Sequence, residues 1–235
     1  MKQVCVLIPM YQPRLNGVEQ TAFDNIYNSL SGHNVTLLKP HSLDFRHLKK
    51  DYPQLAVQSF DESYFQGFNP FNRLMLSDEF YERFSDFEYL LIAKLDVYIF
   101  GDALSGFCAK GYDYISTPYI GQHSWIARLL AKDKGAADRI GGNPSIALRK
   151  VDSHLEALKK YDERRKYYLE NQIDERLFWQ TEVPEFKLAD NQESLSFAFG
   201  QHPKQCYLLN GNKLPFACCN WHSKGEKTKF WKQYI

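Results

Sequence analysis

The stretch YLLIAKLDVYIFGD, residues 89–102, predicts a buried strand, yet one carboxylate, Asp96, stands inside its apolar run. A buried carboxylate is costly unless it is paired, bound to a metal, or placed at the open end of the strand. In open α/β sheets, ligands bind beyond the carboxyl ends of the strands. Asp96 is therefore a candidate binding residue near the end of a central strand. The structural alternative is that Asp96 caps a turn or pairs with a nearby cation such as Lys94.

Runs of β-branched and aliphatic residues alternate with helical patterns on both sides of this stretch. Such alternation predicts βαβ units and a largely parallel sheet within a single α/β domain. The first expected strand is followed neither by the G-x-G-x-x-G fingerprint nor by a phosphate-loop lysine motif, which argues against nicotinamide-dependent enzymes and kinases. The expected strands are 4–10, 34–40, 55–60, 89–102, 112–120 and 145–150, and the expected helices are 17–32, 42–52, 70–84, 151–170, 174–180 and 190–199.

Composition narrows the class of protein further. With 29 Lys and Arg against 28 Asp and Glu, the net charge is +1, so we expect no nucleic-acid partner. No apolar run is long enough for a signal peptide or a membrane span, which predicts a cytoplasmic protein. The 5 cysteines favour reduced thiols over a disulfide framework. Cys218, Cys219 and His222 could ligate zinc, but no second paired spacing supports a zinc site, and buried apolar cysteines are the alternative.

Several stretches together resemble a bacterial glycosyltransferase-like family of the GT-A fold, known mainly as a domain of unknown function. The resemblance implies a Rossmann-related, mostly parallel sheet flanked by helices. It also implies a nucleotide-binding half at about 1–102, an acceptor half at about 103–221 and a basic tail at 222–235. The matching stretches are LIPMYQP (7–13), YFQGFNPFNRLMLSDEFYERFSDFEYLLIAKLDVYIF (64–100), GYDYISTPY (111–119), GNPSIALRK (142–150), ERLFW (175–179) and NGNKLPFACCNW (210–221).

Transferases of this kind carry an Asp-x-Asp signature that holds the ribose and a divalent metal bound to the diphosphate. Here the signature is Asp96-Val97-Tyr98. The resemblance implies Asp96 and His222 as metal ligands, with Asp102 as a weaker candidate. Because one aspartate makes a poor Mg²⁺ or Mn²⁺ site, we expect weak or partial metal dependence. The donor-binding candidates are Pro9, Tyr11, Asn72, Arg73, Asp96, Tyr98, His222 and Lys224.

The segment NQIDERLFWQ, residues 171–180, resembles an acidic motif ahead of a Phe-Trp pair that carries the base in many inverting transferases. Inversion requires a carboxylate that accepts the proton of the acceptor hydroxyl. The register of the Phe-Trp pair favours Glu175, whereas a shift of one residue favours Asp174. The structural alternative is an acidic first helical turn, which the helix dipole stabilises.

The acceptor site is expected at the stretch before residues 146–150. The family usually has Gly-Asn-Gly-Gly there, whereas this chain has Gly142-Asn143-Pro144-Ser145. Asn143 remains available as a hydrogen-bonding group, and an ordinary turn into a strand is the alternative. The acceptor-binding candidates are Asn143, Ser145 and Trp179.

The resemblance therefore implies a transferase that moves a sugar from a nucleotide-sugar donor to a hydroxyl of a bacterial surface glycan or lipid-linked saccharide, with inversion, in polysaccharide or lipopolysaccharide biosynthesis. The alternative is a degenerate protein of this fold that binds nucleotide or glycan without turnover. The tail HSKGEKTKFWKQYI holds Lys224, Lys227 and Lys229, which could fold over the diphosphate together with His222. The tail could instead rest on an anionic membrane at the inner face, or be a solvated end.

Overall fold

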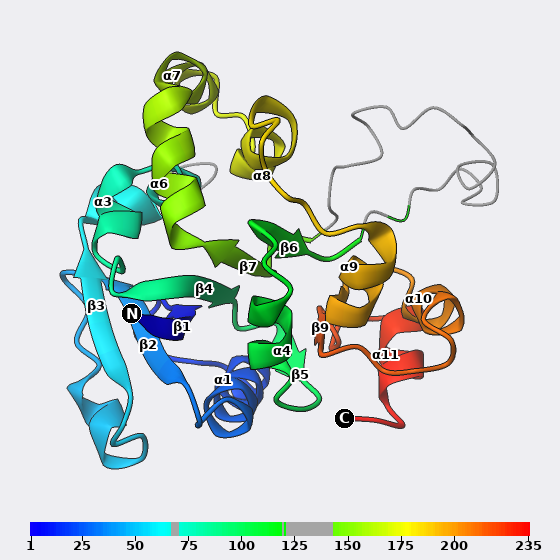
Figure 1. Ribbon diagram of the computed structural model, residues 1–235. Coiled ribbons are helices and arrows are strands. Elements are labelled where there is room, and N and C mark those ends of the chain that lie inside the picture. The colour runs from blue at the N-terminus through cyan, green and yellow to red at the C-terminus, as the bar shows by residue number, and fades with distance from the viewer. Residues whose placement is uncertain (67–70, 119, 121–142) are drawn as a thin grey trace, which may run out of the picture.

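The computed structural model describes residues 1–66, 71–118, 120 and 143–235, and its centre is a 6-stranded sheet (Figure 1). The strand order is β3-β2-β1-β4-β7-β6. The first four of these strands pair in parallel, whereas β7 is antiparallel to both β4 and β6. The strands are β1 (Lys2–Pro9), β2 (Asn34–Pro40), β3 (Ala56–Phe60), β4 (Phe87–Ala93), β6 (Tyr114–Ser116) and β7 (Ile146–Lys150).

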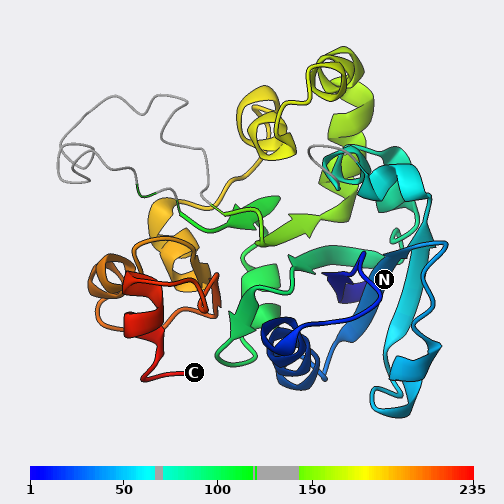
Figure 2. The ribbon, with the colours of Figure 1, turned by 180° about the vertical axis from the view of Figure 1, so that it is seen from behind.

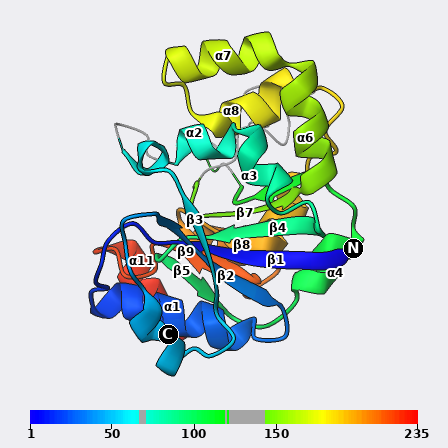
Figure 3. The ribbon, with the colours of Figure 1, turned by 90° about the vertical axis from the view of Figure 1, so that its left-hand side faces the viewer.

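Helices cover both faces of this sheet (Figure 3). Successive side chains of β1 alternate between two cores: Val4, Val6 and Ile8 join one, and Cys5 and Leu7 join the other. One face is covered by η1 (Arg46–Lys50), α1 (Gly17–Ser29) and α4 (Leu104–Ala109). The opposite face carries η2 (Glu62–Phe65), α2 (Asn72–Met75), α3 (Asp78–Glu82), α6 (Val151–Lys160), α7 (Asp162–Glu170), α8 (Glu175–Leu177) and η4 (Phe178–Glu182).

A second, 3-stranded sheet packs with the C-terminal helices beside the first (Figures 1 and 2). Its order is β5-β9-β8, where β5 and β9 are antiparallel and β8 and β9 are parallel. A small core holds Leu195, Phe199, Cys206, Cys218 and Trp231. The elements are β5 (Val97–Ile99), β8 (Ala198–Phe199), β9 (Ala217–Cys219), α9 (Asn191–Phe197), α10 (Pro203–Leu209) and α11 (Glu226–Trp231).

The expected strand at 89–102 is wrong in one respect, because it is two strands in two sheets. β4 ends at Ala93, and the chain turns before β5 begins at Val97. Two backbone hydrogen bonds hold the turn: Lys94 N–H donates to the carbonyl of Ser145 (2.8 Å), and Val97 N–H donates to the carbonyl of Lys94 (3.0 Å). Asp96 therefore lies in a turn at the end of β4, where a carboxylate can meet solvent or a ligand.

The expected helix at 70–84 also divides. α2 ends before Leu76, and the hydroxyl of Ser77 accepts a hydrogen bond from Phe80 N–H (3.2 Å), so Ser77 caps a new helix, α3. Pro70, at the start of the expected helix, lies outside the described residues. Across the described part of the chain, no helix has the length and apolar character that crossing a membrane requires.

Candidate functional site

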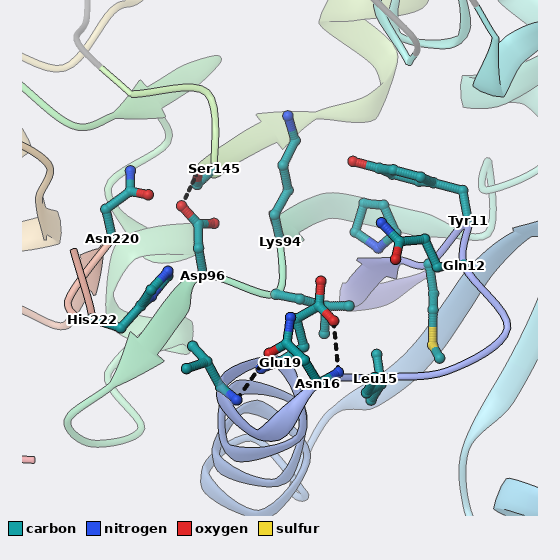
Figure 4. A pocket seen from close by; sticks show the side chains of 14 residues that line it. Tyr11, Gln12, Leu15, Asn16, Glu19, Lys94, Asp96, Ser145, Asn220 and His222 are labelled. Atoms are coloured by element: carbon teal, nitrogen blue, oxygen red, sulfur yellow. Dashed lines mark hydrogen bonds between the residues drawn. The ribbon is translucent and has the colours of Figure 1, made fainter. Parts of the chain in front are cut away.

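A cavity of about 580 Å³ lies where the parallel strands β1 and β4 end (Figure 4). Five chain segments that are distant in sequence meet there. They are the end of β1, the start of α1, the turn between β4 and β5, the residue before β7, and the residues after β9. The lining residues are Pro9, Met10, Tyr11, Gln12, Leu15, Asn16, Val18, Glu19, Lys94, Leu95, Asp96, Ser145, Asn220 and His222. This is the edge at which open α/β sheets bind ligands.

A chain of hydrogen bonds orients the carboxylate of Asp96. The hydroxyl of Ser145 donates to Asp96 Oδ2 (2.7 Å), and Ser145 N–H donates to Asn143 Oδ1 (2.8 Å). Asn143 N–H in turn donates to the hydroxyl of Thr117 (2.7 Å). Within the described part of the chain, no hydrogen bond reaches Asp96 Oδ1. One carboxylate oxygen is therefore fixed, and the other can accept a hydrogen bond from a ligand.

Lys94 reaches into the same cavity from the β4–β5 turn and lies between Asp96 and Tyr11 (Figure 4). Its ammonium stands 5.8 Å from the ring centre of Phe71. Burial lowers the pKa of Lys94, and the negative charges of Glu175 and Asp96 oppose that shift. Burial, together with the charge of Asp96, raises the pKa of Tyr11. The cavity thus combines an aromatic side chain, a carboxylate and an ammonium.

The first turn of α1 forms another wall of the cavity and is closed by its own cap. Asn16 Oδ1 accepts hydrogen bonds from the N–H groups of Val18 (3.0 Å) and Glu19 (3.0 Å), while Glu19 Oε2 accepts from Asn16 N–H (2.9 Å). This capping box uses the backbone donors that would otherwise bind an anion. The carboxylate of Glu19 adds negative charge at the same place. A phosphate group is therefore not favoured at the start of α1.

The two candidate bases lie outside the cavity lining. Glu175 is buried and makes a bidentate ion pair with Arg149 on β7 (2.8 and 3.0 Å). Asp174 caps α8 and makes a bidentate pair with Arg176 (2.9 and 2.6 Å). Burial would raise the pKa of Asp174, but the hydrogen bonds and charge of Arg176 prevail and lower it. Both carboxylates are thus neutralised by an arginine.

The structure places several other candidates away from the cavity. Asn72 holds the segment before α8, because its amide donates to the carbonyl of Ile173 (2.7 Å) and accepts from Glu175 N–H (2.7 Å). Trp179 is fully buried and stacks on Phe186 (5.7 Å between ring centres), so its ring is not exposed to an acceptor. Arg73 and Lys224 are exposed and do not line the cavity.

Tyr98, which stands where the signature has its second aspartate, faces the small C-terminal core. Its ring contacts Phe100 (5.4 Å) and Trp221 (6.0 Å). Asp102 lies elsewhere and pairs with His33 (3.0 Å). Of the candidates from the sequence, the cavity brings together Pro9, Tyr11, Asp96, Ser145 and His222, while Asn143 supports Ser145 from behind.

Sequence reasoning named Lys94 only as a partner for Asp96, and it did not name Asn220 or Glu19. The signal for Lys94 was its place two residues before Asp96 at the end of an apolar run. A lysine there cannot continue a buried strand without a reason for its charge. Asn220 N–H donates to the carbonyl of Asp96 (2.8 Å), a contact between positions 124 residues apart in number that the sequence pattern does not reveal.

The side chains offer a thin set of metal ligands. Across the described residues, no group of three His, Cys, Asp or Glu side chains could hold a metal ion. Asp96 and His222 line one cavity, so a divalent ion there would need the phosphate oxygens of a donor to complete its shell. The zinc alternative has no support in this part of the chain, because Cys218 and Cys219 are adjacent in β9 and point into different cores.

The sequence of the chain matches one known protein family. A family model described as "Protein of unknown function (DUF5672)" matches residues 54–219, and the chain therefore belongs to this family. No protein of curated function matches the sequence.

Solved structures resemble this one along nearly its whole length. The galactosyltransferase LgtC, in complex with donor and acceptor sugar analogs, matches with a TM-score of 0.59 and 10% identity over 97% of this chain and 94% of that chain. A glycosyltransferase involved in the glycosylation of the major capsid of PBCV-1 matches with a TM-score of 0.54 and 12% identity over 98% and 99%. The bifunctional glycosyltransferase WbbM matches at 0.53 and 9% over 95% of this chain and 46% of that chain. These likenesses confirm the expected GT-A fold.

Proposed function

We propose that the protein is a nucleotide-sugar-dependent glycosyltransferase that acts on a hydroxyl of a bacterial surface glycan or lipid-linked saccharide. The observation that carries the proposal is Asp96, held by Ser145 with one open oxygen in a cavity at the carboxyl edge of β1 and β4. The proposal is also supported by the fold, because LgtC, which was solved with donor and acceptor sugar analogs, covers 97% of this chain.

In the proposed complex, the nucleotide lies in the cavity and a ribose hydroxyl donates to Asp96 Oδ1. The donor's diphosphate leaves as the glycosidic bond breaks, and its developing charge must be stabilised by nearby positive groups. The acceptor hydroxyl attacks from the opposite face when the reaction inverts. A carboxylate on that side takes the hydroxyl proton.

Of the two candidate bases, we favour Asp174. Glu175 is buried and is held by both nitrogens of Arg149, so it would leave an uncompensated arginine if it took a proton. Asp174 is less enclosed, and the lowered pKa keeps it ionised at neutral pH. Accepting a proton requires that its pair with Arg176 opens when the acceptor binds. Catalytic hydrogen bonds often form only in the complex, so the distance from the cavity lining in the free protein does not exclude this role.

A divalent ion, when bound, would neutralise part of the diphosphate charge. Asp96 and His222 would be its protein ligands. Because these two side chains are few for Mg²⁺ or Mn²⁺, we propose weak or partial metal dependence. Activity titrated against a chelator tests this point, and its complete loss would restore Asp96 as an ordinary metal ligand.

Peripheral membrane contact through the tail is part of the proposal for lipid-linked acceptors. It is supported by Lys224, Lys229 and Lys232, which are all exposed. Removing the tail by truncation after Trp221 would also remove part of the small core, because Trp231 is only 2% exposed and stacks on Phe100 (5.4 Å between ring centres). Substituting the exposed lysines together preserves this core. Vesicle sedimentation with anionic and neutral lipids then measures the contact, and donor binding without lipid shows whether the same lysines serve the diphosphate.

The experiment that tests the function measures donor hydrolysis and transfer across a panel of nucleotide sugars. Activity with at least one donor is expected, and Asp96→Asn should reduce turnover sharply while the circular dichroism spectrum stays unchanged. The anomeric configuration of the product, determined by NMR, decides between inversion and retention. Retention would remove the need for Asp174 as the base.

The second candidate is a protein that binds nucleotide or glycan without turnover. The thin ligand set and the pairing of both candidate bases with arginines favour it. Nucleotide binding in the absence of any hydrolysis or transfer across the panel would support this second candidate over the first.

A further inference from the structure

We propose that Lys94 binds the diphosphate of the donor and stabilises the leaving group, the task that a metal held by a second aspartate would otherwise serve. The inference rests on the proposed function and adds to it a cationic residue at the cavity. It is carried by the position of the Lys94 side chain and by the lack of an ion pair to its ammonium within the described residues.

Lys94 is fixed at its backbone and open at its ammonium. Its N–H donates to the carbonyl of Ser145 (2.8 Å), which holds the turn against the start of β7. The side chain then rises between Asp96 and Tyr11 and helps to line the cavity (Figure 4). Within the described residues, the ammonium makes no hydrogen bond and no ion pair, and it lies 5.8 Å from the ring centre of Phe71.

Within the described residues, neither neighbouring carboxylate forms an ion pair with this ammonium. Asp96 Oδ2 accepts from the hydroxyl of Ser145 (2.7 Å), and both oxygens of Glu175 accept from Arg149. An ammonium that has lost part of its hydration without gaining a partner is costly to the free protein. An anionic ligand in the cavity would supply the missing partner.

The other positive groups are less well placed for this task. Lys94 is the one side chain with a fixed positive charge among the described residues that line the cavity. Arg149 and Arg176 are engaged with Glu175 and Asp174. At the start of α1, the capping box already engages the N–H groups of Asn16, Val18 and Glu19.

Tyr98, which stands where the signature has its second aspartate, also points away from the cavity. The ring of Tyr98 lies against Phe100 and Trp221, so an acidic side chain in that direction would not face the ligand. This arrangement leaves Asp96 to accept from the ribose and Lys94 to meet the phosphates. A charge-assisted contact of this kind is stronger than a neutral hydrogen bond.

The test is calorimetric titration of the full-length protein with uridine, guanosine, adenosine and cytidine diphosphates and with the four parent nucleosides, in the presence of a chelator. Lys94→Met removes the ammonium, Lys94→Arg retains a cation, and Lys204→Met removes an exposed lysine of α10 as the matched control. For the diphosphate that binds best, Lys94→Met should weaken affinity by about 10- to 100-fold, the range for hydrogen bonds to charged groups. Nucleoside affinity should change little, Lys94→Arg should recover part of the loss, and Lys204→Met should match the wild type.

The outcomes separate this inference from the proposed function. Equal diphosphate affinity in the wild type and Lys94→Met, at equal thermal stability, would overturn the role of Lys94 and leave the transferase proposal standing. The role of Lys94 is overturned in the same way if the chelator alone abolishes diphosphate binding and added Mn²⁺ restores it equally in both proteins. If the wild type binds none of the diphosphates with or without metal, both proposals fail.

Discussion

Two charged regions of this protein differ in how their charges are satisfied. Beside α8, the arginine of β7 and the glutamate of α8 form a closed pair, Arg149–Glu175, at 3% and 8% side-chain exposure. At the cavity, Asp96 is held through one oxygen only, and Lys94 has no ion pair in the described part of the chain. A buried ion pair such as Arg149–Glu175 stabilises the position of a helix. Charged side chains without an ion pair, such as Asp96 and Lys94, are available to a ligand. The comparison therefore favours a structural role for the first region and agrees with the proposed donor binding at the second.

The largest effect is expected from opening the closed pair. Arg149→Met leaves Glu175 buried without a partner, and the free energy of unfolding should fall by about 3–5 kcal/mol. Urea unfolding followed by circular dichroism measures the change. The double variant Arg149→Met with Glu175→Leu is the matched control, because it removes both charges and should recover most of the stability. A single variant as stable as the wild type would mean that the pair does not hold α8.

Asp174 is paired with an arginine, like Glu175, but is proposed to act on the acceptor. If it is the base, Asp174→Asn should reduce turnover by about 10²- to 10⁴-fold, the usual contribution of a general base. Asparagine caps a helix as well as aspartate does, so the fold should persist. Asp162→Asn, which alters another arginine-paired aspartate at a helix start, is the control in the same assay. Full activity of Asp174→Asn would place the base elsewhere.

A buried histidine beside the closed pair predicts how stability depends on pH. Burial and the charge of Arg149 hold the pKa of His154 well below its usual value, so the folded protein keeps the ring neutral while the unfolded chain can protonate it. Its contribution is complete above about pH 6.5 and is lost as the pH falls. Stability should decrease by about 1–2 kcal/mol between about pH 7.5 and about pH 5.

The slope of unfolding free energy against pH, compared with that of His154→Phe, isolates the contribution of this residue. The comparison does not depend on the absolute stability of the variant. An equal slope in both proteins over this range would show that His154 does not titrate on unfolding as proposed.

Ser145 orients the carboxylate of Asp96 at the cavity, and its contribution to donor binding can be measured. Ser145→Ala removes the hydroxyl that orients Asp96, and donor affinity should fall by about tenfold, the lower range for a hydrogen bond to a charged group. Thermal stability should change little. Ser153→Ala, which removes a hydroxyl that donates to Asp113 (2.5 Å), is the control outside the cavity. A donor affinity equal to that of the wild type would show that Asp96 does not need this support.

The smallest effect, and the most diagnostic in sign, is the stability of Lys94→Met. Because the folded pKa of Lys94 is lowered, its charged form is less favourable in the folded than in the unfolded protein at neutral pH. Removing it should leave the melting temperature equal to or above that of the wild type. A clear decrease in melting temperature would indicate that Lys94 forms an ion pair in solution and has a structural role, like the Arg149–Glu175 pair.

Much of the central sheet was predictable because its strands are rich in β-branched and aliphatic residues. NVTLLKP was expected as a strand and is β2, Asn34–Pro40. The small sheet was not predictable: β5 and β8 are 3 and 2 residues long, and β5 pairs with β9 at the other end of the chain. Such short strands carry no periodic signal, and their pairing depends on tertiary contacts.

The site shows the same division. Asp96 and Tyr11 line one cavity because each follows a parallel strand at the same sheet edge, which the order of elements implies. Their roles in donor binding remain predictions. The pair of Glu175 on α8 and Arg149 on β7 joins residues 26 apart in number, and the sequence motif alone gave no sign of it. A motif indicates which residues are present, whereas burial and pairing decide which of their side chains a ligand can reach.

The most direct test of the account is a crystal structure of the full-length protein with each of several nucleoside diphosphates. We expect a nucleotide in the cavity at the ends of β1 and β4, with a ribose hydroxyl within hydrogen-bonding distance of Asp96 and the phosphates beside Lys94. A nucleotide bound elsewhere, with Asp96 and Lys94 making no contact to it, would rule out the proposed donor site.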